Sequence, residues 1–182
     1  MDGEQVLTAP VTIEYPFRRT TGPVIGAFMT GLREGLIVGI RGADGRVLVP
    51  PQEYDPLTAE DLTEIVEVGN AGVVTTWCWI DEPLEGQPFD RSFAWALVRL
   101  DGADTAMVHA LDTGGDPSAV HTGMRVQARW RPARPADVEA DSKADDGGRY
   151  REGHILDIEC FEPVTDSAGA VDQPAADQEV AR

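Results

Sequence analysis

The stretch VVTTWCWI (73–80) carries apolar or aromatic side chains at both odd and even positions. Side chains alternate between the two faces of a β-strand, so Val74, Cys78 and Ile80 are expected on one face and Trp77 and Trp79 on the other. A strand with apolar groups on both faces is typical of the interior of a sheet. The stretch therefore predicts a central, curled strand, the longest of a β-barrel.

Further strand-like runs surround this stretch between residues 62 and 163: LTEIVEVG, SFAWALVRL, TAMVHALD, MRVQARW and GHILDIECFEP. Each is short and rich in β-branched or aromatic residues, and Gly, Asp, Asn or Pro bounds it. With one helix-sized gap at 112–123, the pattern favours a five-stranded Greek-key barrel of the OB type. An immunoglobulin-like sandwich is the alternative, although Trp77 and Trp79 flank Cys78 instead of lying between two cysteines.

The segment TTGPVIGAFMTGLREG (20–35) predicts an amphipathic helix before the barrel. Pro23 suits a first helical turn, and Gly35 suits the position after a helix end. Val24, Phe28 and Leu32 recur at i, i+4 and i+8, which places them on one face, with Ile25 beside them. The fold class is thus mainly β, with an N-terminal helix.

Between helix and barrel, IRGADGRVLVPPQEYDPLTAED (40–61) has the spacing of a CxxC…CxxC zinc ribbon without its cysteines. Asp44-Gly45 is a strong hairpin signal, and the proline-rich second half predicts a returning loop. The ligand positions hold Arg41, Asp44, Asp55 and Thr58, which are poor zinc ligands, so no metal is expected. Arg41 paired with Asp44 or Asp55 would hold the ribbon without metal; ordinary solvated turn residues are the alternative.

The predicted organisation has four parts. Residues 1–20 form an N-terminal arm, 21–61 the helix and the metal-free ribbon, 62–163 the barrel, and 164–182 a disordered acidic tail. A polar segment, 131–152, is expected as a flexible insertion in the last hairpin.

Charge and composition exclude several classes of protein. The chain has 32 acidic and 15 basic residues, a net charge of −17, which disfavours nucleic acid as a partner. It shows neither an 18-residue apolar window nor a secretory start, so no membrane partner is expected and the location is expected to be cytoplasmic. Cys78 and Cys160 are expected to be buried thiols, and His109 a structural residue, because no nucleophile pattern accompanies them.

The order of these parts carries a resemblance. A helix with a Gly-Pro start, the frame GRVLVPPQEYDP (45–56) and AWALVRLDG (94–102) resemble the domain of unknown function thirty-five family, over about residues 11–163. Proteins of that family combine a helix, a rubredoxin-like zinc ribbon and a C-terminal OB-fold. The resemblance implies a non-catalytic accessory subunit that docks on a thiolase-like enzyme, either a thiolase or a retro-aldolase, acting on acyl-CoA. Steroid side-chain or other lipid breakdown is the implied setting.

The resemblance also implies roles for individual residues. The apolar helix face, Val24, Ile25, Phe28 and Leu32, is then the expected docking surface, with packing in the chain's own core as the alternative. Arg18, Arg19 and Arg33 are candidates to bind CoA phosphates. No cofactor of its own is expected, but a CoA thioester would be bound jointly with the partner.

Two other functions stay open at this stage. Trp77, Trp79, Phe93 and Trp95 could serve a single-stranded nucleic-acid-binding OB-fold, which predicts a salt-sensitive gel shift. A free-standing acyl-CoA enzyme predicts turnover by the chain alone.

Overall fold

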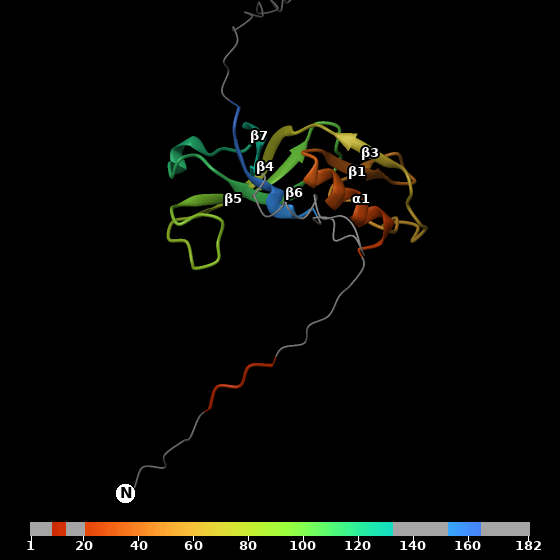
Figure 1. Cartoon of the computed structure of the whole chain (residues 1–182). Helices are drawn as coiled ribbons and strands as arrows, with labels where there is room; N and C mark the ends of the chain where they lie inside the picture. The colour runs from red at the N-terminus through yellow and green to blue at the C-terminus, as the bar shows by residue number, and fades with distance from the viewer. Residues whose placement is uncertain (1–8, 14–20, 133–152, 165–182) are drawn as a thin grey trace, which may run out of the picture.

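The computed structural model describes residues 9–13, 21–132 and 153–164 (Figure 1). Arg18, Arg19, most of the N-terminal arm, most of the 131–152 insertion and all but the first residue of the 164–182 tail lie outside the described residues. Residues 9–13 adopt no regular structure.

The helix α1 spans Gly22–Arg33, close to its predicted bounds. Pro23 lies in its first turn, and Gly35 follows its end with a φ of 77°, a left-handed conformation that glycine adopts without strain. Thr21 occupies the N-cap position, but its side chain makes no capping hydrogen bond.

A three-stranded antiparallel sheet follows the helix, in the order β2-β1-β3. The predicted Asp44-Gly45 hairpin joins β1 (Ile37–Arg41) to β2 (Val47–Leu48), and Ile40 pairs with Leu48. Gly45 has a φ of 84°, which explains the glycine in this turn.

The third strand corrects one sequence-based expectation. LTEIVEVG was expected among the barrel strands, but β3 (Ile65–Val68) pairs with β1, with Ile37 opposite Val68. The reason is that β2 covers only one edge of β1, so the other edge is open to a strand that returns from the loop. The boundary drawn at residue 62 itself stays a prediction.

The remaining strands form a closed barrel in the order β4-β5-β6-β8-β7. They are β4 (Ala71–Ile80), β5 (Phe93–Leu100), β6 (Met107–Leu111), β7 (Arg125–Trp130) and β8 (Ile158–Pro163). Closure of a five-stranded barrel confirms the OB-type prediction over the sandwich. The helix-sized gap at 112–123 holds a single 3₁₀ turn, Pro117–Ala119, and a second one, Ile155–Asp157, precedes β8.

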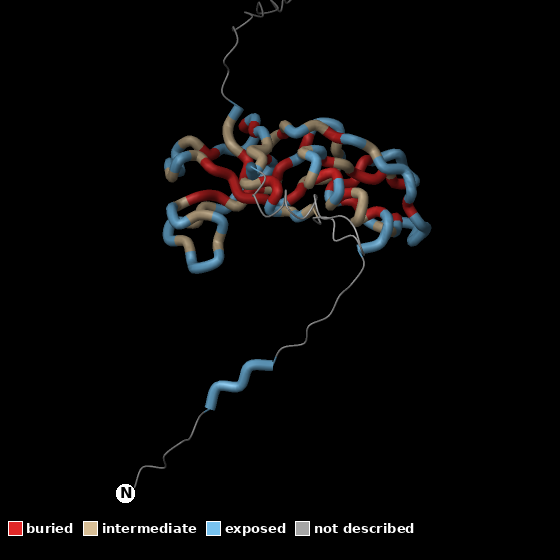
Figure 2. The backbone as a smooth tube through the Cα atoms, viewed as in Figure 1, coloured by how far each residue is buried: buried red, intermediate tan, exposed pale blue. Residues whose placement is uncertain are grey.

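The ribbon sheet and the barrel share one hydrophobic core. Phe28 and Leu32 of α1 and Ile37 of β1 belong to the same buried cluster as Val74 and Phe161 of the barrel. Figure 2 shows buried segments in the interior of both parts. Hydrogen bonds reinforce the junction, since the β2 end is held by the β5–β6 loop: the N–H of Val47 donates to Asp104 Oδ2 (2.8 Å) and that of Val49 to Thr105 Oγ1 (2.7 Å).

The central strand is the longest of the barrel, as predicted, but its two faces are not divided as alternation suggests. The β4–β5 register shifts between Val74 and Thr76, so one extra residue is inserted there. A bulge of this kind reverses which face the following residues occupy. Trp77 and Trp79 therefore share the face of buried Val74, opposite Ala96 and Ala94, while Thr76, Cys78 and Ile80 face outward.

Candidate functional site

The ribbon has two turns that carry its ligand positions, which we call the first knuckle (residues 41–45) and the second knuckle (residues 55–58). One carboxylate, that of Asp55, joins the two knuckles. Its side chain is 3% exposed. Oδ2 accepts a hydrogen bond from the Ala43 N–H of the first knuckle (2.8 Å), and Oδ1 accepts from Leu57 (2.7 Å) and Thr58 (3.1 Å) in the second. These bonds, the one from Ala43 first, lower the pKa of Asp55 below its ordinary value. A buried carboxylate at one of the four ligand positions thus joins the two turns of the ribbon.

The expected Arg41 salt bridge with Asp44 or Asp55 is wrong. Arg41 Nε donates to Glu64 Oε1 (2.7 Å) and Arg41 Nη1 to the Gly45 carbonyl (3.1 Å). Asp44 instead pairs with Arg46, two residues away. The local turn brings Asp44 to Arg46, and the β3 approach brings Glu64 to Arg41. In the part of the chain that the structure describes, no group of three His, Cys, Asp or Glu side chains could hold a metal ion.

The helix residues expected to dock a partner are mostly buried inside the chain. Phe28 and Leu32 lie in the shared core, and Val24 packs with Ile40 and Leu48 of the ribbon. The structure therefore favours the core alternative for these three, because the ribbon sheet covers the apolar face of α1. Ile25 is half-buried, and its N–H lies 3.4 Å from Glu53 Oε1.

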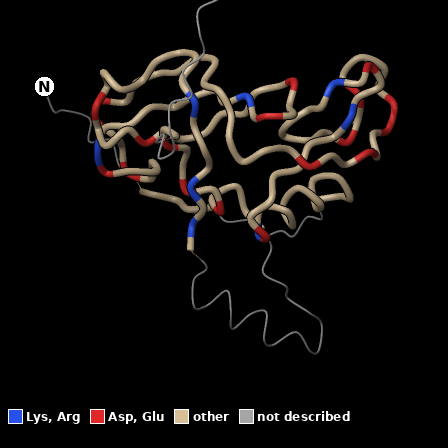
Figure 3. Tube along the Cα trace, turned by 90° about the horizontal axis from the view of Figure 1, so that it is seen from above, with Lys and Arg blue, Asp and Glu red and all other residues tan. Residues whose placement is uncertain are grey.

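Of the proposed CoA-phosphate candidates, only Arg33 is within the described residues. It lies in the last turn of α1 and forms a 3.3 Å ion pair with Glu34. Arg125 of the barrel is also paired, since it binds both carboxylate oxygens of Asp101 at 2.7 and 2.6 Å. Figure 3 shows acidic positions distributed over the described chain. This arrangement does not favour an anionic polymer along the barrel.

The outer face of β4, β5 and β6 carries an uncharged surface arranged in cross-strand rows. Leu97 pairs with Thr76 on one side and with Val108 on the other, and Trp95 pairs with Cys78 and Ala110. Val108 is 59% exposed, and Cys78 is exposed too, so the expectation of a buried Cys78 thiol is wrong. The bulge in β4 is the cause, since it turns Cys78 outward. In OB-folds this strand face and the loop after the first barrel strand commonly bind ligands.

Toward the β4–β5 loop this face is covered by an aromatic cluster around Phe93, which is fully buried and packs against partly buried Phe89 and Trp95. Phe93 makes edge-to-face contacts with Phe89 (5.6 Å between centroids) and with Trp95 (5.4 Å). The guanidinium of Arg91 lies 5.1 Å from the Phe89 ring centroid. The aromatic cluster therefore ends at a charged group that belongs to a polar network around the buried Asp112.

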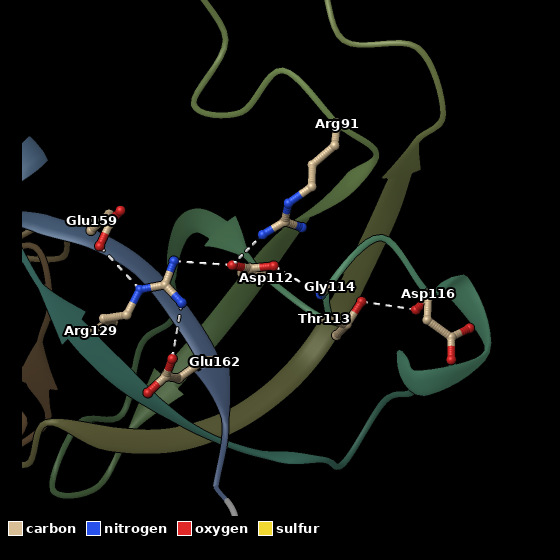
Figure 4. A network of polar contacts seen from close by, with 8 residues as sticks. All are labelled: Arg91, Asp112, Thr113, Gly114, Asp116, Arg129, Glu159 and Glu162. Carbon is tan, nitrogen blue, oxygen red and sulfur yellow. Dashed lines mark hydrogen bonds and ion pairs between the residues drawn. The ribbon is translucent and has the colours of Figure 1, made fainter.

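That network centres on Asp112, which follows β6 (Figure 4). Asp112 Oδ2 accepts hydrogen bonds from Arg91 (2.7 Å) and Arg129 (3.0 Å), and Oδ1 accepts from the Gly114 N–H (2.9 Å). Burial alone would raise the pKa of Asp112, but these donors outweigh it and hold the pKa below its ordinary value. Arg129 also binds Glu159 and Glu162 of β8, both at 3.0 Å. The network links the end of β6 to β7 and β8. Because Nε, Nη1 and Nη2 of Arg129 each donate to a carboxylate, this guanidinium is not available to bind a phosphate bidentately.

Two buried groups that could do nucleophilic or acid–base chemistry, Cys160 and His109, are unsuited to it. Burial raises the pKa of the Cys160 thiol to about 12, so it is protonated at neutral pH. His109 is buried against Phe161, and burial lowers its pKa. Its Nε2 lies 3.4 Å from the Ile155 carbonyl, and its Nδ1 has no hydrogen-bond partner. Within the described ranges, the arrangement offers contact surfaces and no paired nucleophile and base.

His109 gives a pH prediction for stability. The folded state resists protonation of the buried imidazole, while the unfolded chain takes up a proton near pH 6.5, so acid favours unfolding. One such group contributes a slope of at most about 1.4 kcal/mol per pH unit below pH 6.5. His109→Met is expected to reduce the acid-side slope of the unfolding free energy between about pH 6.5 and 5, measured by urea titration. His121→Met, at an exposed position, is the control; equal slopes for both variants would contradict the prediction.

Comparisons with known proteins place this fold. A sequence model described as "ChsH2, C-terminal OB-fold domain" matches residues 65–131. A solved structure of an Ltp2-ChsH2(DUF35) aldolase is similar over 80% of this chain and 98% of that chain, with 21% identity and a TM-score of 0.52, which shows a shared fold. A DUF35-family protein of unknown function from Sulfolobus solfataricus matches over 59% of this chain and 77% of that chain, with 22% identity and a TM-score of 0.49.

A comparison with curated proteins finds no match. No helix among the described residues is long and apolar enough to cross a membrane. Because the family match spans most of the barrel and the shared fold spans both parts, the sequence-based resemblance is confirmed. Residues 65–131 of this chain match the ChsH2 C-terminal OB-fold domain, and the chain shares its fold with the Ltp2-ChsH2(DUF35) aldolase structure.

Proposed function

We propose that this protein is an accessory subunit of an aldolase-type enzyme complex. The observation that carries the proposal is the match of residues 65–131 to the OB-fold domain of ChsH2, a protein named together with Ltp2 as an aldolase in a solved structure. The described residues support it in two ways. They hold an exposed uncharged stretch in the second half of β4, which includes Thr76 and Cys78, and their buried His109 and Cys160 are unsuited to catalysis.

The finer parts of the proposal concern partner and substrate. The partner is a thiolase-like protein that supplies the catalytic groups, and the complex cleaves a carbon–carbon bond of an acyl-CoA in the breakdown of steroid side chains or other lipids. This chain carries no cofactor or zinc of its own and helps to complete the CoA-thioester site. Because the apolar face of α1 packs against the ribbon and the shared core, we place the partner contact on the barrel instead of on that face.

Co-expression with a thiolase-like protein encoded beside this chain tests the proposal. The two chains are expected to elute as one hetero-oligomer in size-exclusion chromatography with light scattering, and cleavage of the acyl-CoA is expected only from the complex. Separate elution of the two folded proteins would contradict the accessory role. Turnover by this chain alone would favour a free-standing enzyme, and a salt-sensitive shift of single-stranded DNA would favour the nucleic-acid-binding alternative.

A further inference from the structure

The second half of β4 has a backbone edge without a strand beside it. β4 pairs with β5 along its length, but with β7 only at residues 71–73. The last bonds on that side join Val74 to Met124 (3.1 Å) and to Gly123 (2.8 Å). From residue 76 to 80, no described residue pairs with this edge.

The direction of the free backbone groups follows from Val74. Its side chain faces the barrel interior, while its N–H and C=O point away from β5. In a strand, residues on the same face direct these groups to the same side. Trp77 and Trp79 share the interior face, so their N–H and C=O groups also point to the open edge. A second strand would find alternating donors and acceptors there.

This edge lacks the features that normally prevent strand addition. Natural proteins protect edge strands with charged side chains, proline, shortness or a covering segment. β2 is two residues long and is covered by Asp104 and Thr105, and β3 carries Glu67. The sequence TWCWI (76–80) has no charged residue and no proline, and Trp77 is 36% exposed. Residues 76–80 of β4 are therefore open to an added strand.

Charges at one end of the edge indicate which segment would fit. The β4–β5 loop begins directly after Ile80, and its residues 81–90 include four exposed carboxylates: Asp81, Glu82, Glu85 and Asp90. Leu84, in the same loop, is 75% exposed. In an antiparallel arrangement, the N-terminal end of an added strand would lie at this acidic loop. Basic residues at that end would complement it.

We propose that residues 76–80 of β4 form a strand-addition site for an extended, uncharged segment of the partner subunit that begins with basic residues. The identity of the partner rests on the proposed function. The chemistry of the added segment rests only on the β4 edge and the acidic loop beside it. Main-chain hydrogen bonds to Trp77 and Trp79 supply affinity, and the acidic loop fixes the direction.

A peptide probe tests the chemistry with the full chain. The labelled peptide acetyl-Arg-Arg-Thr-Val-Thr-Val-Thr is expected to bind in fluorescence anisotropy. The same peptide with alternate amides N-methylated, or with the two arginines moved to the C-terminal end, is expected to bind about tenfold more weakly, because it loses hydrogen bonds or charge complementarity. Equal binding of all three peptides would overturn the proposal. So would slow hydrogen exchange at the Trp77 amide in the isolated chain, since it would mean that the edge is already covered.

Variants separate the edge from the neighbouring apolar face. Cys78→Lys places a charge on the open edge and is expected to weaken peptide binding about tenfold. Val108→Lys places the same charge on β6, an inner strand of the same surface, and is expected to leave binding unchanged. Circular dichroism and melting confirm that both variants fold. Equal weakening by both would overturn strand addition in favour of docking on the face.

The complex distinguishes this inference from the proposed function. Loss of co-elution with the thiolase-like protein in Cys78→Lys, but not in Val108→Lys, supports the site. Co-elution retained in Cys78→Lys overturns the site and leaves the accessory role intact. If the unmodified chain binds the peptide but no thiolase-like protein, the accessory role fails and the site stands. A concentration-dependent dimer of the chain that Cys78→Lys abolishes would overturn a partner segment in favour of a second copy.

Discussion

Asp55→Ala is expected to lower the melting temperature by on the order of 5 to 10 °C, because one buried carboxylate joins the two knuckles of the ribbon. The substitution leaves the N–H groups of Ala43, Leu57 and Thr58 without their acceptor. Its effect should reach beyond the loop, since the ribbon sheet covers α1 and shares the barrel core. Thermal unfolding followed by circular dichroism measures it.

Asp44→Ala is the matched control, because Asp44 occupies the other acidic knuckle position but bonds only with Arg46 at the surface. A shift as large as that of Asp55→Ala would show that the carboxylate bridge has no special role. Acid should act in the same direction. The lowered pKa of Asp55 means that its contribution is complete above about pH 4, the value in the unfolded chain, and is lost as the pH falls through the lower folded value.

The local signals in the sequence were sufficient for the hairpin and the helix end. Asp44-Gly45 predicts a tight turn, and the structure has Gly45 in the left-handed region between paired β1 and β2. Gly35 likewise follows the end of α1. Both depend on the backbone freedom of one residue, which the sequence states directly.

The faces of β4 could not be predicted, because alternation assumes an unbroken register. A single inserted residue between Val74 and Thr76 moves Trp77 and Trp79 to the interior face and Cys78 outward. Nothing in VVTTWCWI marks the bulge, since its cause is the curvature needed to close a barrel. The open edge of β4 could not be predicted from the sequence either, because it depends on where β7 stops pairing with β4.

The role of Asp55 was missed for a different reason. Its turn-forming character was visible, but the donor most distant in sequence is the backbone N–H of Ala43. Every residue except proline has a backbone N–H, so the sequence does not indicate which one donates. For α1, the apolar face of Val24, Phe28 and Leu32 was predicted correctly, but a periodic pattern cannot tell which surface covers it. The sheet β2-β1-β3 does so here.

Asp112→Ala is expected to destabilise the barrel by about 2 to 3 kcal/mol, somewhat below the ~3–5 kcal/mol of fully buried ion pairs, because both arginines reach solvent. Asp112 is buried and accepts from Arg91, Arg129 and the Gly114 N–H. β6 and β8 are paired in the barrel at one position, Leu111 opposite Phe161, so this closure depends strongly on side chains beside it.

Asp101→Ala gives the comparison, because Asp101 also binds an arginine, Arg125, through both oxygens but at the surface. Its loss should cost at most about 1 kcal/mol, since exposed ion pairs are weak. Urea unfolding of both variants tests the contrast, and equal costs would contradict it. Hydrogen exchange locates the effect: Asp112→Ala should speed exchange at the residue 112 N–H, which donates to Phe161 across the β6–β8 closure. Faster exchange confined to the 113–116 turn would mean that the network orders the turn and does not hold the barrel closed.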